Sequence, residues 1–115
     1  MKGKSCDTFA PAGPELVTVD EIDDPQDLSL WTKVNGEVRQ NSVTSDMIFS
    51  VEEMVSYASK FMILLPGDVI ATGTPSGVAR GFDPPRFLRN GDVVELGIEG
   101  VGEIRPTVVE RWQAL

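Results

Sequence analysis

The stretch LSLWTKVNGEVRQNSV, residues 28–43, is the part of the sequence that says most about the fold. Two runs of polar and apolar residues flank the pair Asn35-Gly36, and both of these residues tolerate the positive φ angles of a tight hairpin turn. The segment therefore predicts a β-hairpin. Its alternation is imperfect, because Val34 and Glu37 would share one face across a two-residue turn, so the register of the two strands stays open.

Further strands are predicted on both sides of this hairpin. A second hairpin is expected in residues 93–110, with its turn at Glu99-Gly100. Residues 14–19 form a short β-branched run that ends at an acidic turn, and we interpret this run as a single strand. Residues 69–72 predict a buried strand that leads directly into the glycine-rich loop of residues 73–77.

A single helix is expected between these strands. Ser50 and Glu53 have the spacing of a capping box, and Phe49 and Met54 stand at the hydrophobic staple positions, so the helix should begin at Val51. Apolar residues then recur at three- and four-residue spacing, which predicts an apolar stripe that a sheet covers. The stripe consists of Val51, Met54, Val55, Ala58, Phe61 and Met62.

These elements predict a β-rich α+β fold, sandwich-like, with one principal helix near residues 51–62. Successive helical crossovers are missing, which argues against a doubly wound parallel sheet. A chain of 115 residues has the size of one domain, so we expect residues 1–115 to form a single domain.

Composition narrows the classes of function. The net charge is −8, with 18 acidic and 10 basic residues, which argues against a nucleic-acid partner. The longest apolar run, residues 61–65, is too short to span a bilayer, and no secretory signal is evident, so no membrane association and a cytoplasmic location are expected. A single cysteine, Cys6, fits a reducing compartment. Because the chain has no histidine, its chemistry must rely on carboxylates, lysine, hydroxyl groups or a hard metal ion.

The opening triplet Gly3-Lys4-Ser5 looks like the end of a phosphate-binding loop, but only two residues precede it. There is no room for the first glycine of that motif or for the strand it follows. The triplet is therefore either an accident or part of a different motif.

Five blocks, taken together, point to a family: GKSCDTFAPAGPELVT, LWTKVNGEVRQ, TSDMIFS, PGDVIATGTPSGV and NGDVVELGIEGVGEI. In this order they resemble the C-terminal part of the fumarylacetoacetate hydrolase family. The resemblance implies part of a mixed β-sandwich roll and the C-terminal half of a longer catalytic domain. It also implies a metal-dependent hydrolase, lyase or isomerase of small 2-oxo or β-dicarbonyl acids.

The resemblance assigns roles to a few positions. Lys4 matches a lysine beside the metal, and Thr74 matches a threonine that, with neighbouring groups such as Gly73, binds substrate oxygens. Both Lys4 and Thr74 are thus catalytic candidates, and Thr8 resembles a position that helps to hold a second ion in some members. From the residues alone, residues 73–77 could equally be an ordinary strand-to-loop turn, and Lys4 a solvated charge near a terminus.

The resemblance also implies Mg²⁺ or Mn²⁺ as cofactor. The family's metal carboxylates, a Glu-x-Glu pair and a later Asp, lie upstream of its Gly-Lys-Ser stretch, and this sequence does not contain them. Asp7, Asp46 and Asp68 each have an ordinary explanation in a turn or near a terminus. Three interpretations stay open: a truncated domain that is inactive alone, a split enzyme completed by a partner chain or by homo-oligomer formation, and a non-catalytic binding or oligomerisation module.

Overall fold

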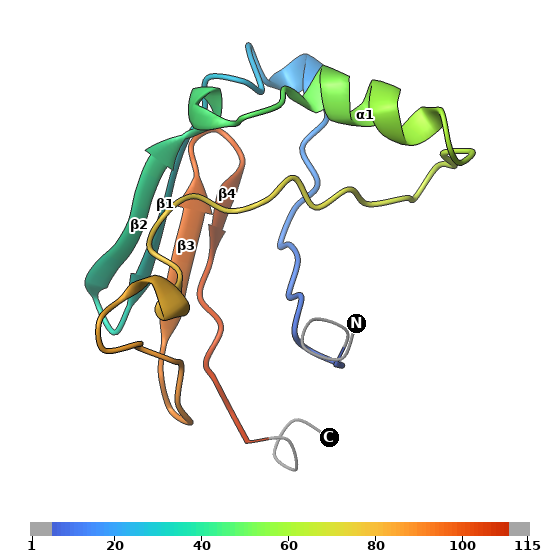
Figure 1. Cartoon of the computed structure of the whole chain (residues 1–115). Coiled ribbons are helices and arrows are strands. Elements are labelled where there is room, and N and C mark those ends of the chain that lie inside the picture. Colours follow the sequence, from blue (N-terminus) through green and yellow to red (C-terminus); the bar gives the residue numbers. More distant parts are fainter. Residues whose placement is uncertain (1–5, 111–115) are drawn as a thin grey trace.

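The structure, a computed structural model, describes residues 6–110 and consists of one antiparallel sheet and one α-helix (Figure 1). The four strands are ordered β2-β1-β3-β4 across the sheet, and the helix α1 lies at one end of it. The expected α+β fold class is confirmed. The elements are β1 (Ser29–Val34), β2 (Glu37–Val43), α1 (Val51–Ser59), β3 (Val94–Ile98) and β4 (Gly102–Ile104), with 3₁₀ turns η1 (Val19–Glu21), η2 (Thr44–Asp46) and η3 (Ala79–Gly81).

The β1–β2 hairpin forms around the predicted turn, where Asn35 and Gly36 have φ angles of 53° and 81°. Val34 pairs with Glu37, as a two-residue turn requires. The register then shifts, since Lys33 pairs with Val38 and Thr32 with Gln40, which leaves Arg39 as the extra residue of a β-bulge. The pairing settles the open register: Val34 and Glu37 lie directly opposite each other, and the bulge follows at Arg39.

The second predicted hairpin, β3–β4, is also confirmed, and β3 pairs with β1 so that the two hairpins form one sheet. Asn35 connects them at the end of the sheet where its turn lies. Its Nδ2 donates to Asp92 Oδ1 at 2.9 Å, and its Oδ1 accepts a hydrogen bond from the backbone N–H of Val93 at 2.9 Å.

The helix begins at Val51 as predicted. Ser50 Oγ accepts from the backbone N–H of Glu53 at 3.1 Å, and Glu53 Oε2 accepts from the backbone N–H of Ser50 at 2.8 Å, which completes the capping box. α1 ends at Ser59, three residues before the expected end near residue 62. The backbone N–H groups of residues 61 and 62 both donate to the carbonyl of Ala58, so the chain closes a turn there and leaves the helix.

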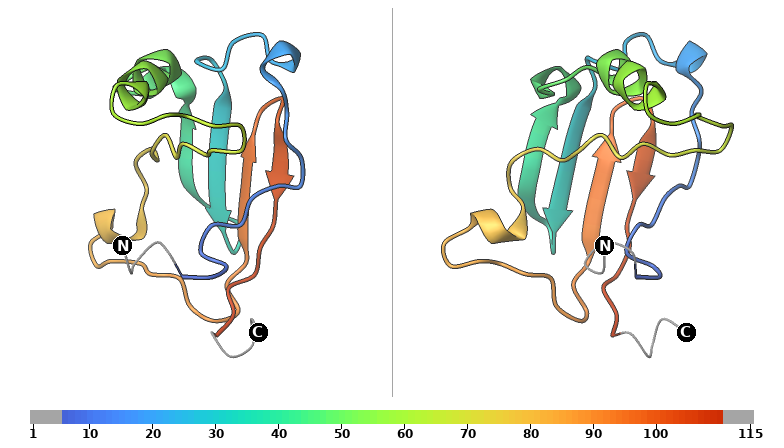
Figure 2. Two further views of the ribbon diagram at one scale, coloured as in Figure 1. Left: turned by 90° about the vertical axis from the view of Figure 1, so that its right-hand side faces the viewer. Right: turned by 45° about the vertical axis from the view of Figure 1, so that its right-hand side comes forward.

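Two predicted strands are wrong. Residues 14–18 and 69–72 run without secondary structure, and Leu16 and Val69 are 93% and 92% exposed. Residues 62–76 run across one face of the sheet without joining it as a strand (Figure 2). A strand exists only when a neighbouring strand takes up its backbone hydrogen bonds, and within residues 6–110 neither segment pairs with one.

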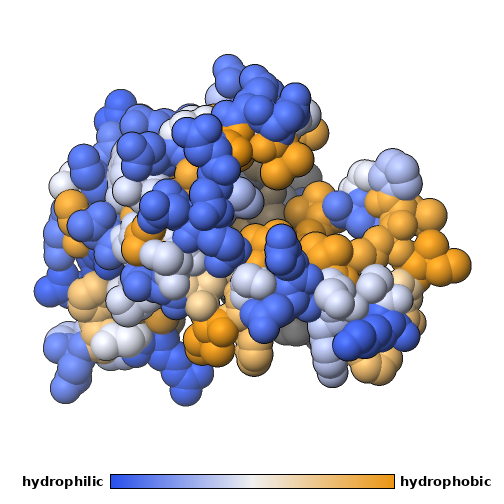
Figure 3. Space-filling view, turned by 90° about the horizontal axis from the view of Figure 1, so that it is seen from above, coloured by the Kyte–Doolittle hydropathy of each residue, from blue (hydrophilic) through white to orange (hydrophobic). Residues whose placement is uncertain are grey.

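The described part of the chain has no fully buried hydrophobic side chain. Val51, Met54 and Ala58 of the predicted stripe are half-buried, whereas Phe61 and Met62 are 70% and 60% exposed. The prediction that a sheet covers the whole stripe is therefore wrong, because the sheet lies beside the beginning of α1 and does not reach past its end. In the view from above, hydrophobic side chains gather in the middle and on the right of the molecule, whereas its left part is mostly hydrophilic (Figure 3).

Within residues 6–110, the helical segments are too short and too polar for any of them to cross a lipid bilayer.

Candidate functional site

The loop of residues 73–77 is attached to the edge strand β2 by one side chain. Gln40 Nε2 donates to Thr74 Oγ1 at 2.9 Å and to the backbone carbonyl of Pro75 at 2.9 Å. Gln40 follows the bulge residue Arg39 directly, so the bulge sets the position of the amide group that holds the loop.

Two glycines allow this close approach. Gly73 and Gly77 have φ angles of 112° and 103°, which non-glycine residues rarely adopt. At Gly77 space matters as well, because a Cβ atom there would overlap the carbonyl oxygen of Arg39 and lie 2.8 Å from its carbonyl carbon. Residue 77 must therefore be glycine for the loop to rest on the bulge.

A cavity of about 390 Å³ lies beside the loop. Residues 72–75 form one wall, and the end of β2 with η2 forms another. Much of the remaining lining is apolar, and it includes Leu30, Met47, Ile48, Phe49 and Met54. Asp46 is the one ionisable side chain among the lining residues, and its Oδ2 accepts from Ser42 Oγ at 2.7 Å. The Thr74 hydroxyl group is thus a polar group at the boundary of a largely apolar cavity.

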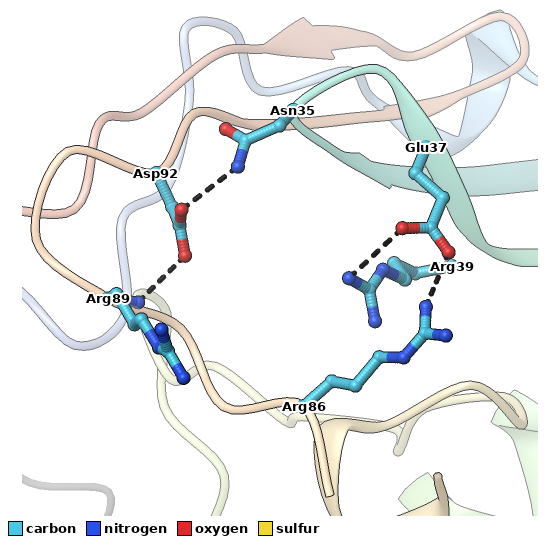
Figure 4. Close-up of polar contacts among 6 residues, drawn as sticks. All are labelled: Asn35, Glu37, Arg39, Arg86, Arg89 and Asp92. Carbon is cyan, nitrogen blue, oxygen red and sulfur yellow. Dashed lines mark hydrogen bonds and ion pairs between the residues drawn. The ribbon is translucent and has the colours of Figure 1, made fainter. Parts of the chain in front are cut away.

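Charged and polar side chains gather around the bulge residue Arg39 and the hairpin turn (Figure 4). Glu37 forms ion pairs with Arg39 at 3.3 Å and with Arg86 at 2.7 Å. The guanidinium groups of both arginines lie 5.0 Å from the ring centre of Phe82, within the range of cation–π attraction. These contacts tie the segment after the loop to the hairpin and so hold Arg39 in place.

Asp92 closes the other end of this cluster. The hydrogen bond from Asn35 lowers the pKa of the Asp92 carboxyl group below its usual value, and the bond from the backbone N–H of Arg89, at 2.7 Å, acts in the same direction. The carboxylate of Asp92 therefore has a structural role at the tip of the hairpin.

Comparison with known proteins identifies the family. A family model described as fumarylacetoacetate (FAA) hydrolase C-terminal matches residues 1–109. The chain belongs to the fumarylacetoacetate hydrolase family. Among curated relatives, it is 52% identical over 102 residues to the oxaloacetate tautomerase YisK of Bacillus subtilis, a match that covers 89% of this chain and 34% of the relative.

Two solved structures of the family share the fold. A fumarylacetoacetate hydrolase from Exiguobacterium antarcticum has a TM-score of 0.92 and 46% identity, with 96% of this chain and 39% of that chain covered. A maleylpyruvate hydrolase from Sphingobium sp. SYK-6, in complex with manganese(II) and pyruvate, has a TM-score of 0.81 and 41% identity, with 90% of this chain and 36% of that chain covered. The chain thus spans between a third and two fifths of the length of these three relatives.

The site residues predicted from the sequence of this fumarylacetoacetate hydrolase family chain lie in different parts of it. Gly73 and Thr74 lie side by side at the cavity. Thr8 lies in an exposed turn with a φ angle of 67°, outside the cavity lining, and no hydrogen bond of the described residues joins it to Thr74. Lys4 lies outside residues 6–110, so its predicted place beside a metal stays a prediction.

Residues 6–110 do not fit a divalent metal ion by themselves. Nowhere in this range do three or more histidine, cysteine, aspartate or glutamate side chains come together as metal ligands. Asp46 is hydrogen-bonded to Ser42, and Asp68 Oδ2 accepts from the backbone N–H of Leu65 at 2.8 Å within its turn. A hard cation takes about six oxygen ligands, so carboxylates from other residues would be needed.

Sequence reasoning missed Gln40, the residue that anchors the loop. Its only signal was indirect: the imperfect alternation around Asn35-Gly36 left the register of the hairpin open, and the bulge that the structure shows directly before Gln40 is part of that register. The partner of Gln40 lies 34 residues further along the chain and could not be read from local pattern.

Proposed function

We propose that this chain supplies the substrate-binding side of an enzyme site for small 2-oxo or β-dicarbonyl acids. In this proposal Gly73 and Thr74 contact oxygen atoms of the acid, and Lys4 holds its carboxylate group. The observation that carries the proposal is the loop of residues 73–77, which is fixed on β2 with the Thr74 hydroxyl group at a cavity of about 390 Å³.

The relatives support this class of substrate. They include hydrolases, isomerases and a tautomerase, and the solved maleylpyruvate hydrolase complex contains pyruvate, a 2-oxo acid, together with manganese(II). A cavity of a few hundred cubic ångströms with apolar walls and a few polar groups suits a small molecule.

The proposal assigns the metal to other residues. Mg²⁺ or Mn²⁺ would stabilise negative charge on the oxo acid, but residues 6–110 offer no group of ligands for it. We therefore expect a second polypeptide part, in the same chain or another, to supply the carboxylates. Alone, residues 1–115 should not turn over substrate.

A chimera tests this proposal. The part of the Bacillus subtilis tautomerase that this chain does not match is joined to residues 1–115, and conversion of oxaloacetate and of an acylpyruvate is measured against buffer with Mg²⁺. We expect conversion by the chimera, loss of conversion in the chimera with Thr74→Val, and none by the chain alone. Conversion by the chain alone that Thr74→Ala abolishes would contradict the need for a second part. Full activity of the folded Thr74→Val chimera would contradict the role of Thr74.

The exposed apolar surface favours a second candidate function, that of a subunit whose main role is to bind a partner. Phe61, Met62, Ile63 and Leu65 are each at least 60% exposed, and the described part of the chain has no fully buried hydrophobic side chain. Such a surface typically marks a contact with protein. A chain that binds a partner through this surface but binds no oxo acid would support this second function. A chain that binds an oxo acid but no partner would exclude this second function.

A further inference from the structure

We propose that Gln40 is a positioning residue that leaves the hydroxyl hydrogen of Thr74 free to donate to a ligand. The loop of residues 73–77 would then offer a hydrogen-bond donor to ligands that present an oxygen acceptor, such as a carboxylate. This inference rests on the proposed function of Thr74 and deepens it, because it assigns the direction of the hydrogen bond and the residue that sets that direction.

The carbonyl of Pro75 fixes the orientation of the Gln40 amide. A carbonyl oxygen only accepts hydrogen bonds, and it lies 2.9 Å from the end of the Gln40 side chain. If the amide were turned over, two oxygen atoms would face each other at this distance. The nitrogen of Gln40 therefore faces the loop, and the oxygen faces away.

The same nitrogen determines the role of Thr74. Its second hydrogen is donated to Thr74 Oγ1 at 2.9 Å, so both hydrogens of the amide group are used. An amide nitrogen has no free acceptor site, which means that the Thr74 hydroxyl hydrogen cannot point back at Gln40. Among the hydrogen bonds of residues 6–110, Thr74 Oγ1 has no other partner, and Thr74 is exposed at the cavity.

The bulge keeps Gln40 in this position. Side chains alternate between the faces of a strand, so one residue fewer before Gln40 would place its side chain on the opposite face of β2. Gly77 leaves room for this side chain, because an ideal Cβ at residue 77 would lie only 3.1 Å from Gln40 Cγ. The loop and the glutamine side chain are therefore packed against each other.

Pyruvate is the probe for a test with the full chain. Gln40→Met removes both donors without adding charge. Gln40→Glu replaces the donor with an acceptor that draws the Thr74 hydroxyl hydrogen toward residue 40 and away from a ligand. Gln26→Glu is the matched control, because Gln26 Oε1 accepts from the backbone N–H of Val51 at 2.8 Å and a carboxylate keeps that bond. It adds the same charge away from the loop.

The first readout needs no ligand. The side-chain amide signals of Gln40 are recorded by nuclear magnetic resonance in the wild-type chain and in the Thr74→Val variant. We expect one of the two hydrogens to shift upfield in the variant as it loses its partner, while the amide signals of Gln26 do not change. Unchanged Gln40 signals would overturn the inference.

The second readout is the affinity for pyruvate, followed through the backbone amide signals of residues 73–77. A hydrogen bond to a charged group corresponds to a change of about tenfold or more in the dissociation constant, so Gln40→Glu, which draws the Thr74 hydrogen away from the ligand, should bind at least that much more weakly. Gln40→Met loses the two hydrogen bonds that hold the loop on β2 and should also bind more weakly, whereas Gln26→Glu should bind as the wild type does. Equal binding by wild type and Gln40→Met would overturn the inference and leave the role of Thr74 standing. If the wild-type chain does not bind pyruvate, the proposed function fails for the isolated chain, and the amide signals of Gln40 decide the inference.

Discussion

Substitution of Gly77 by alanine should detach the loop from the bulge. The new Cβ atom would overlap the carbonyl oxygen of Arg39, and backbone at this point cannot move without shifting the β1–β2 hairpin. We expect the loop to move instead, so that Gln40 loses its hydrogen bonds to Thr74 and Pro75. The same residue also has a φ angle of 103°, which alanine adopts at a cost.

Gly67 offers a matched control that separates these two effects. Its φ angle is 98°, close to that of Gly77, but a Cβ atom there would meet nothing within 4 Å. Gly67→Ala should therefore lower the free energy of unfolding by the conformational cost alone, roughly 1–2 kcal/mol. Gly77→Ala should lower it by about 2 kcal/mol more, because two hydrogen bonds of about 1 kcal/mol each are lost as well.

Urea unfolding of the two variants measures this difference, and the amide signals of Gln40 and Thr74 show whether the loop has moved. Gly77→Ala should shift these signals, whereas Gly67→Ala should leave them in place. Equal destabilisation by both substitutions, with unmoved signals in Gly77→Ala, would refute the claim that the loop rests on the bulge.

Three further predictions concern other parts of the molecule. Ser50→Ala removes the N-cap of α1 and should destabilise the helix by about 1 kcal/mol, which circular dichroism in urea measures; an unchanged midpoint would contradict the cap. The folded pKa of Asp92 lies below its ordinary value of 3.8, so its contribution to stability is present above pH 3.8 and is lost as the pH falls through the folded pKa. Asn35→Ala should raise this pKa toward 3.8, and a carboxyl titration that does not change would count against the hydrogen bond. Arg86→Met should cost at most about 1 kcal/mol, because Arg86 and Glu37 are 49% and 55% exposed, and added salt should remove the difference; a larger loss that salt leaves intact would contradict it.

Local features of the fold were predictable from the sequence. The Asn35-Gly36 turn and the Ser50 cap depend on residues within a few positions of each other, and both form where the sequence places them. Residues 14–19 and 69–72 have the composition of strands but form none, because a strand also needs a neighbour to accept its hydrogen bonds. Composition carries no information about whether that neighbour is present.

The candidate site was predictable in part. The resemblance pointed to Gly73 and Thr74, and the structure places both at a cavity, while their roles in binding stay predictions. Gln40 could not be found in this way, because its function depends on a bulge and on a contact across 34 positions of the chain. Long-range contacts of this kind become visible only once the register of the hairpin is known.

A calorimetric titration of the chain with Mn²⁺ in the presence of oxalate tests the central claim most directly. Oxalate chelates the metal and imitates the enolate form of a 2-oxo acid. We predict no saturable binding of Mn²⁺, because no group of three metal-ligating side chains occurs in residues 6–110 and the carboxylates must come from another polypeptide part. Saturable binding that is lost in Thr74→Ala would show that the chain builds a complete metal site. It would contradict the proposal that another polypeptide part supplies the carboxylates.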